Sequence, residues 1–320
     1  MPWWSALARP SNLPAFLWLA LTLAASQGVA GDFAYVTNQG SEDLSIIDLD
    51  ARKETARIPV PGKPAGVAAS LDGIFTVSPE DKTVRRFGPD GAQLGAIRLD
   101  GGPIGIVHDP ARGRLYVSDW YNARIWEIDA RRMRLTGTLE SGSAPAGLDI
   151  SHSGRWLASA DRDSNAVSLF DIGGSAPRRS IPVGSRPFGL AFDPRDRLFV
   201  ANVGSDDVSV IDPRDGTQLA LVPVGARPYG IAFAQGRAFV TNQYAGTLSV
   251  IDLETLEVSH TLEVGEYPEG VAVAGSDGPL VVANWFSNTV TLIDPRTLET
   301  LGEVETGDGP RAFGRFIIAP

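Results

Sequence analysis

The chain has 320 residues and a formal net charge of −10, from 28 Lys and Arg against 38 Asp and Glu. This sign disfavours non-specific binding to nucleic acid or to an anionic membrane surface. Cysteine is absent, which excludes disulfides, thiolate metal sites and covalently attached c-type haem. The hydrophobic content of 43%, with 35 Gly and 23 Pro, indicates a packed interior with frequent turns.

The first predicted element is an apolar segment over residues 13–25. It is shorter than the ~20 residues that cross a bilayer as a helix. Gly28-Val29-Ala30 follows it and supplies the small residues of a signal-peptidase site. We therefore predict a signal peptide over 1–30, cleaved near Ala30, and a mature chain over 31–320 without a membrane span, in the periplasm or secreted. Arg9 is the only basic residue before the segment, so the n-region is weak. The alternative is an uncleaved anchor helix, against which the short length of the segment counts.

A repeat occupies the rest of the chain, and its marker is Pro-x-Gly, where x is any residue. Successive marker prolines lie 39, 42, 42, 41, 40 and 42 residues apart. The seven prolines are Pro64, Pro103, Pro145, Pro187, Pro228, Pro268 and Pro310, the last with Ala312 in the Gly position. Four-stranded propeller blades have a period of ~40–45 residues. We therefore predict an all-β fold, a seven-bladed β-propeller forming one domain over 31–320.

Each repeat predicts four short antiparallel strands, a to d from the ring axis outward. The repeat at Pro228 predicts strands over 231–234, 238–242, 247–252 and 258–264. Strand a carries small residues, which fit where the blades converge. The Asn that ends strand b, such as Asn242, is expected to bond nearby backbone and to tolerate left-handed geometry. The Asp that ends strand c, such as Asp252, is expected to cap the next turn, so six aligned carboxylates indicate a structural repeat.

The order of the strands predicts how the ring closes. After residue 30 the chain begins on a strand b over Phe33–Asn38 and continues with c and d before its first strand a. It ends on a lone strand a over 312–318. Three N-terminal strands and one C-terminal strand are therefore expected to complete one blade, which removes an open sheet edge.

The repeated phrases resemble those of a known family. Tyr35-Val36-Thr37-Asn38 and its variants at 199–202, 239–242 and 281–284 occur with SVIDP, SVIDL and VGxxPxG phrases. Residues 33–320 are similar to the YVTN-repeat β-propeller family, although Ser78, Asp119 and Asp161 stand in the Asn region of three repeats.

The chain's ending, GDGPRAFGRFI at 307–317, resembles one branch of that family, which is associated with PQQ-dependent catabolism of alcohols. The resemblance implies an exported scaffold more than an activity. Other relatives bind single-stranded DNA, and the heavy chains of periplasmic amine dehydrogenases share the seven-bladed design.

No catalytic or metal-binding arrangement is predicted, and no cofactor. His108 takes a strand-a position that holds Phe in other repeats, so we expect it to be packed. His152 falls in a turn and His260 on an outer strand, so the three do not converge as metal ligands must. The segment 161–165 imitates the start of a calcium loop but lacks its Gly and its bidentate Glu. We expect a b–c hairpin turn there.

One face of the predicted ring carries residues that do not repeat, because the d–a crossovers and the b–c turns emerge on the same side. Aromatic residues and arginines gathered there indicate a recognition surface. The alternative is that these residues only pack between blades, and recognition requires at least half of them to be exposed. The predicted ligand- or partner-binding rim consists of Lys63, Trp120, Tyr121, Arg186, Phe188, Arg227, Tyr229, Tyr244, Tyr267, Glu269, Trp285, Phe286 and Arg311.

We expect a non-catalytic binding or accessory protein whose rim holds a periplasmic protein or a small anionic ligand. The resemblance implies PQQ- or quinoprotein-linked oxidation, with a dehydrogenase or a cytochrome as partner. The alternatives are a propeller subunit of a dehydrogenase, a small-ligand or single-stranded nucleic-acid binder, and an enzyme such as a lyase that uses Glu269 and Arg227. Nucleic acid is the less favoured partner because of the net charge.

Overall fold

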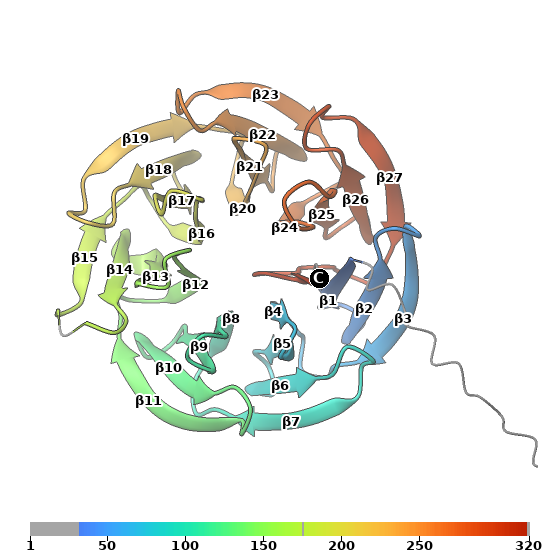
Figure 1. Cartoon of the computed structure of the whole chain (residues 1–320), viewed down its shortest axis with the longest axis horizontal. Coiled ribbons are helices and arrows are strands. Elements are labelled where there is room, and N and C mark those ends of the chain that lie inside the picture. The colour runs from blue at the N-terminus through green and yellow to red at the C-terminus, as the bar shows by residue number, and fades with distance from the viewer. Residues whose placement is uncertain (1–31, 175, 319–320) are drawn as a thin grey trace, which may run out of the picture. The chain divides into compact units, whose positions relative to one another are not determined.

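The computed structural model describes residues 32–174 and 176–318. They form seven four-stranded antiparallel sheets arranged as a ring, with each blade running from the axis outward (Figure 1). The predicted seven-bladed propeller is confirmed. The predicted signal peptide over 1–30 lies outside the described residues. Among the residues that are described, no helix is both long and apolar enough to span a membrane.

The strands of the seven blades have the following bounds, from a to d. The blade that joins the two chain ends holds β28 (Ile317–Ile318), β1 (Phe33–Asn38), β2 (Asp43–Asp48) and β3 (Lys53–Pro59). The second holds β4 (Gly66–Ser70), β5 (Gly73–Ser78), β6 (Thr83–Phe87) and β7 (Gln93–Arg98). The third holds β8 (Pro103–Asp109), β9 (Arg114–Asp119), β10 (Arg124–Asp129) and β11 (Arg134–Glu140). The fourth holds β12 (Pro145–Ile150), β13 (Trp156–Asp161), β14 (Ala166–Asp171) and β15 (Arg179–Pro182), with a 3-10 turn, η1 (Arg162–Ser164), after β13.

The remaining three blades follow the same order. The fifth holds β16 (Pro187–Phe192), β17 (Leu198–Asn202), β18 (Asp207–Ile211) and β19 (Gln218–Pro223). The sixth holds β20 (Pro228–Ala234), β21 (Arg237–Asn242), β22 (Thr247–Asp252) and β23 (Val258–Glu263). The seventh holds β24 (Pro268–Val273), β25 (Leu280–Asn284), β26 (Thr289–Ile293) and β27 (Thr300–Glu305).

Close contact between neighbouring backbones explains the marker glycine. A Cβ atom at Gly147 would lie 2.6 Å from the carbonyl oxygen of Phe188, and one at Gly230 would lie 2.5 Å from that of Glu269. In both cases the oxygen belongs to the x residue of the next marker. The same relation holds at Gly66, Gly105, Gly189 and Gly270. Small residues on strand a are therefore confirmed, and at the glycine the reason is a backbone approach that leaves no room for a side chain.

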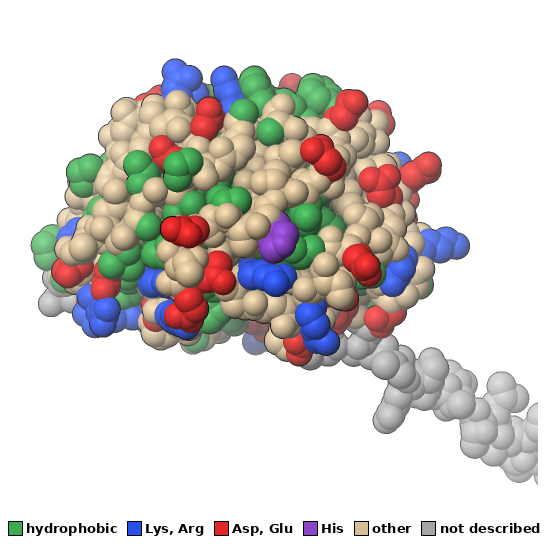
Figure 2. Space-filling view, turned by 90° about the horizontal axis from the view of Figure 1, so that it is seen from above, with side chains coloured by type: hydrophobic (Ala, Val, Ile, Leu, Met, Phe, Trp, Pro, Cys, Tyr) green, Lys and Arg blue, Asp and Glu red, His purple; other side chains and the backbone are tan. Residues whose placement is uncertain are grey.

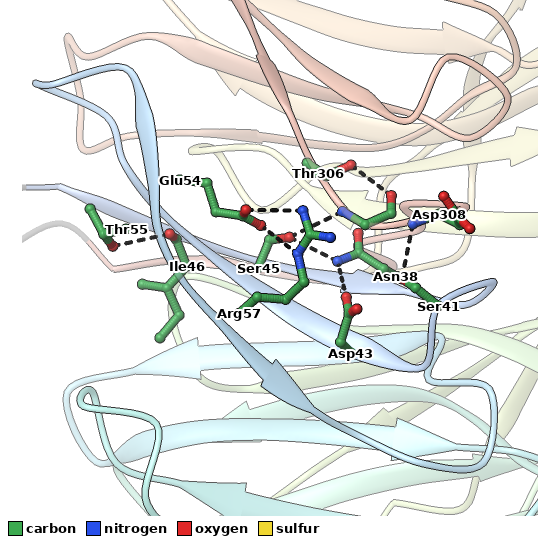
Figure 3. A network of polar contacts seen from close by, with 11 residues as sticks. Asn38, Ser41, Asp43, Ser45, Ile46, Glu54, Thr55, Arg57, Thr306 and Asp308 are labelled. Atoms are coloured by element: carbon green, nitrogen blue, oxygen red, sulfur yellow. Dashed lines mark hydrogen bonds and ion pairs between the residues drawn. The ribbon is translucent and has the colours of Figure 1, made fainter.

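The Asn that ends strand b links strands b and c through side chains. Asn38 Nδ2 donates to Asp43 Oδ1 at 2.6 Å and to Ser45 Oγ at 2.8 Å (Figure 3). Equivalent pairs of bonds start from Asn202, Asn242 and Asn284. None of these four described residues has a positive φ. The expected bond to backbone and the left-handed geometry are therefore wrong, because polar side chains of strand c take the amide instead.

The Asp that ends strand c caps the following turn, as predicted, at five of its six positions, whereas the described donor to the carboxylate of the sixth, Asp171, is the Arg155 side chain. Asp252 Oδ1 accepts hydrogen bonds from the backbone N–H groups of Glu254 at 2.7 Å and Thr255 at 3.0 Å. Equivalent bonds to backbone N–H groups occur at Asp48, Asp129, Asp212 and Asp294. These carboxylates are used within their own turns.

The ring closes as predicted, although the last strand is shorter than expected. β28 pairs with β1, but the residues before it lean on the second blade. Val67 N–H donates to Phe313 O at 3.0 Å, and Ala69 N–H donates to Arg315 O at 2.7 Å. Gly314 lies between them with a φ of +130°, where a side chain would overlap the Val67 carbonyl. The C-terminal segment therefore joins two blades.

Apolar side chains of strands b and c fill the space between neighbouring blades. Phe199 and Val210 of the fifth blade, for example, pack in one buried cluster with Val240 and Ile251 of the sixth. Seen from the side, acidic and basic side chains are interspersed over the outer wall (Figure 2). The apolar packing between blades holds each blade against the next and fixes the loops that connect them.

Candidate functional site

The d–a crossovers and the b–c turns lie together on one face, as predicted. Trp285 N–H donates to the Tyr267 carbonyl at 3.0 Å, and Trp120 N–H donates to that of Gly102 at 2.9 Å. A backbone bond of this kind joins turn to crossover in the other blades through the pairs Gln39–Gly309, Glu80–Gly62, Arg162–Ala144, Val203–Arg186 and Gln243–Arg227. We call this face the rim.

A β-bulge aims the x residue of the marker toward the ring axis. In five blades the register between strands a and b shifts just after the marker proline, as between Pro187 and Leu190. A bulge bends its strand and redirects a side chain. The seven x residues are Ala65, Ile104, Ala146, Phe188, Tyr229, Glu269 and Arg311.

Three aromatic rings close the channel at its rim end, and we call them the axial plug. Phe188 lies 4.5 Å from Tyr229 and 5.0 Å from Phe313 between ring centres, and Tyr229 lies 5.7 Å from Phe313. All three are buried, together with Ala146. They come from separate blades, so they meet at the axis.

Glu269 and Arg311 form a buried ion pair beside the plug. Arg311 Nε lies 2.7 Å from Glu269 Oε2, and Gln243 Nε2 donates to the other carboxylate oxygen at 2.7 Å. Arg311 also donates to the Tyr229 hydroxyl and to Gln39 Oε1. Burial raises the pKa of the Glu269 carboxyl and that of the Tyr229 hydroxyl. Both oxygens of Glu269 are occupied and its side chain is fully buried, so the network ties the plug to the sixth and seventh blades.

Five rim side chains form a continuous row, the aromatic strip, consisting of Arg227, Tyr244, Tyr267, Trp285 and Phe286. The Arg227 guanidinium lies 4.3 Å from the Tyr244 ring centre, and Tyr244 lies 5.4 Å from Tyr267. Tyr267 in turn lies 5.5 Å from Trp285 and 4.8 Å from Phe286. Tyr244 and Phe286 are 57% and 63% exposed. Burial, reinforced by the Tyr244 hydroxyl, raises the pKa of Tyr267 to about 12, so the Tyr267 hydroxyl keeps its proton at neutral pH.

Large side chains of the rim occupy left-handed backbone positions directly before the marker proline. The φ angles are 56° at Arg227, 60° at Tyr267, 52° at Arg186 and 60° at Lys63. The corresponding residue of the last marker is Gly309, with a φ of 65°. Left-handed geometry costs a residue other than Gly roughly 1–2 kcal/mol. Ala144 before Pro145 has the same geometry, with a φ of 52°, so the crossover turn itself imposes it on the residue before the marker proline.

A second cluster lies on the rim of the third and fourth blades. Tyr121 is 77% exposed, and its ring lies over Gly102. The Arg162 guanidinium lies 5.3 Å from the Trp120 ring centre, and Trp120 lies 6.0 Å from Phe188 of the plug. Sequence reasoning missed Arg162. Its position directly after the end of strand b, which Trp120 also occupies in its own blade, could have indicated it.

The thirteen predicted rim residues divide into three groups by exposure. Tyr121, Arg186, Tyr244 and Phe286 are exposed; Lys63, Trp120, Arg227, Tyr267, Trp285 and Arg311 are half-buried; Phe188, Tyr229 and Glu269 are buried. The requirement for recognition by the whole set, that at least half be exposed, is therefore not met, and the buried members pack between blades instead. The bulge explains the buried group, because it turns x residues toward the axis. Exposed ring surface is concentrated in the aromatic strip and the second cluster.

The central channel contains a cavity of about 460 Å³ that the sequence did not predict. Inner-strand residues line it, among them Ile231, Phe233 and Val273, and Phe313 of the plug lies at one end. Asp149, His152 and Arg315 also line it. The lining residues extend to the end of strand a that lies away from the crossovers, so the cavity opens on the face opposite the rim.

The histidines lie where the sequence predicted. His108 is packed, with Nδ1 2.9 Å from Ser70 Oγ and its ring 5.0 Å from that of Phe75. Burial lowers the pKa of His108, so its ring is neutral at pH 7. His152 lies exposed in a turn and His260 lies exposed on β23.

The segment 161–165 forms the expected hairpin connection between β13 and β14. Asp161 takes the Asn position of its blade and accepts hydrogen bonds from the Ser168 hydroxyl, from Ser159 Oγ at 2.9 Å and from Gly142 N–H at 2.9 Å. Burial raises the pKa of the Asp161 carboxyl. These bonds point the carboxylate into the blade.

Comparison with known proteins supports the fold and names no activity. No protein-family model matches the chain. It is 26% identical over 180 residues to the uncharacterized protein YncE of Salmonella typhi, a match that covers 54% of this chain and 51% of YncE. It is 24% identical over 215 residues to antigen Lp49 of Leptospira interrogans, covering 58% of this chain and 46% of Lp49. The chain thus spans about half the length of these relatives.

A solved structure of hydrazine synthase from Kuenenia stuttgartiensis has a TM-score of 0.74 with this chain at 19% identity. The match covers 83% of this chain and 92% of that one. At this identity the likeness concerns the fold.

Proposed function

We propose that the protein is an exported, non-catalytic propeller that binds a partner protein through the aromatic strip. The observation that carries the proposal is the exposed ring surface of Tyr244 and Phe286, backed by Tyr267 and Trp285 and flanked by Arg227. Aromatic residues and arginine are enriched at protein interfaces, and Trp, Tyr and Arg dominate their binding energy. Rings held by their neighbours before binding lose little conformational entropy on binding.

The proposed partner is a quinoprotein dehydrogenase or a cytochrome of the periplasm. The resemblance of residues 307–317 to the PQQ-associated branch supports this proposal. The same segment supports the strip physically, because Gly309 packs under the Trp285 indole and the Arg311 guanidinium lies 5.4 Å from the Trp285 ring centre. Arg227 at the other end of the strip favours an acidic patch on the partner.

Capture of partners from periplasmic extract tests the proposal. The double substitution Tyr244→Ser and Phe286→Ser removes the two exposed rings, and truncation of central interface residues costs ~2 kcal/mol or more each. We expect the parent protein to recover a quinoprotein dehydrogenase or a c-type cytochrome and the double variant to recover at least tenfold less. Leu71→Ser is the matched control, because Leu71 is 79% exposed in the turn between β4 and β5, away from the rim. Equal recovery by all three proteins, or no such partner with the parent, contradicts the proposal.

Export is a separate part of the proposal and has its own test. The apolar segment 13–25 and the small residues before Gly31 support it. Mass spectrometry of the protein from the periplasm should find a chain that begins at Gly31. A chain retained in the cytoplasm with residues 1–30 intact contradicts export.

We propose no catalytic role for Glu269. Its side chain is fully buried, and its two oxygens are bonded to Arg311 and Gln243. A general acid or base must reach its substrate within hydrogen-bond distance, and this carboxylate faces the protein. Turnover of a substrate that is lost in a folded Glu269→Gln variant contradicts this part of the proposal.

Single-stranded nucleic acid is a second candidate, favoured by the presence of two aromatic–arginine clusters on one rim. Base stacking on aromatic side chains contributes ~1–3 kcal/mol per base. Fluorescence anisotropy with labelled oligothymidylate should then show affinity that falls steeply with salt and that weakens in the double variant Tyr244→Ser/Phe286→Ser. Absence of binding at low salt, or affinity that does not depend on salt, excludes this candidate.

A further inference from the structure

We propose that the central channel is a second binding site, which takes a small amphipathic carboxylate from the face opposite the rim. The apolar body of the ligand lies along the inner strands, and its carboxylate is bound by Arg315. The site is independent of the aromatic strip.

The first argument is that the channel is a dead end. Phe188, Tyr229 and Phe313 are buried against one another at the rim end, and Arg311 holds Tyr229 and Glu269 in place beside them. A ligand that enters from the opposite face therefore meets an apolar floor.

The second argument is the size and the chemistry of the walls. The cavity of about 460 Å³ lies within the ~300–1,000 Å³ typical of small-molecule sites. Its lining includes the half-buried side chains of Ala191, Ile231, Phe233, Val273 and Ile317. Covering them removes apolar surface from water, which favours an apolar ligand body at roughly 25 cal/mol per Å².

The third argument is Arg315, which is held by one edge of its guanidinium. Arg315 Nη2 lies 2.8 Å from Asp149 Oδ1 and donates to Ile150 O at 3.2 Å. The side chain of Arg315 is 57% exposed, whereas that of Asp149 is 5% exposed. Within residues 32–174 and 176–318, Arg315 Nε and Nη1 donate to no protein acceptor. An arginine has five N–H donors, so three remain for a ligand carboxylate.

The backbone keeps Arg315 at the wall. Gly314 before it is packed against the Val67 carbonyl, and Ala69 N–H donates to Arg315 O at 2.7 Å. The other titratable groups among the lining residues are Asp149 and His152. Asp149 is already engaged on both oxygens, because Phe192 N–H donates to its Oδ2 at 2.9 Å. Arg315 is the lining side chain that is always positively charged, so we assign the incoming carboxylate to it.

Isothermal titration with decanoate tests the site, with decanol as the uncharged probe of the same length. We expect decanoate to bind the parent protein and to bind Arg315→Gln at least about tenfold more weakly, as is common for the loss of a hydrogen bond to a charged group. Decanol should bind the parent and Arg315→Gln equally. Arg315→Lys should restore part of the decanoate affinity, and Val273→Phe should weaken both probes by filling the channel.

Two further variants keep the test decisive. The first, Asp149→Asn with Arg315→Gln, removes both members of the ion pair, so no buried charge is left without its partner. It replaces Arg315→Gln if that variant does not fold, and it should lose the preference for decanoate over decanol. Tyr244→Ser with Phe286→Ser should bind decanoate as the parent does, whatever becomes of partner capture. The inference is overturned if decanoate does not bind the parent, or if Arg315→Gln binds it unchanged in a folded protein.

Discussion

Replacement of Gly147 by Ala tests the backbone contact that sets the repeat. The added Cβ would lie 2.6 Å from Phe188 O and 3.3 Å from the Phe313 ring. Ordinary van der Waals contact begins at 3.4 Å, so the two blades must separate by about 0.8 Å at this point. Overpacking of this kind costs roughly 1–3 kcal/mol. Because Phe188 and Phe313 belong to the plug, the cost falls at the axis.

The expected loss of stability is about 2 kcal/mol, which for a domain of this size corresponds to a fall in Tm of ~4–8 °C. Thermal and urea denaturation measure it. Gly137→Ala is the matched control, because Gly137 also lies within a strand without a positive φ and its nearest neighbour is the flexible Glu127 side chain at 3.3 Å. Ala there should be neutral or stabilising by up to ~1 kcal/mol. Equal stability of the two variants refutes the reasoning.

Two further predictions concern buried carboxylates. Glu269→Ala leaves Arg311 buried without its partner and should lower the free energy of unfolding, measured by urea denaturation, by about 3–5 kcal/mol. Glu269→Gln can still accept a hydrogen bond and should lower it less. Equal losses in the two variants contradict the pairing. At Asp161, burial raises the folded-state pKa above the unfolded value, so its favourable contribution is present below the unfolded pKa and is lost as pH rises through the folded pKa. Asp161→Asn should therefore be more favourable for stability, relative to the parent, at pH 7 than at pH 3. An equal effect at both pH values contradicts the burial argument.

The number of blades could be predicted because each Pro-x-Gly marker corresponds to one backbone contact between neighbouring blades. Pro-x-Gly recurs since a backbone carbonyl of the next blade passes over the glycine, as Phe188 O does at Gly147. The closing blade followed from the order of strands. The role of Asn38 could not be predicted from local turn rules, because its partners Asp43 and Ser45 lie across the hairpin on strand c.

The face of the candidate site could be predicted from topology, but the depth of each side chain could not. Phe188, Tyr229 and Glu269 are x residues, and the bulge that turns them inward leaves no mark in the sequence beyond the glycine beside them. The channel cavity was missed for another reason. Its width depends on how many blades meet at the axis, and Arg315 reaches it only because Gly314 redirects the C-terminal segment.

The most direct test of the aromatic strip is hydroxyl-radical footprinting of the protein with and without the partner that it captures from the periplasm. Binding through the strip predicts that Tyr244 and Phe286, the exposed rings of the strip, become protected, while Leu71 on the opposite face keeps its reactivity. Protection at Leu71 with unchanged reactivity at Tyr244 and Phe286 would contradict the proposed binding surface.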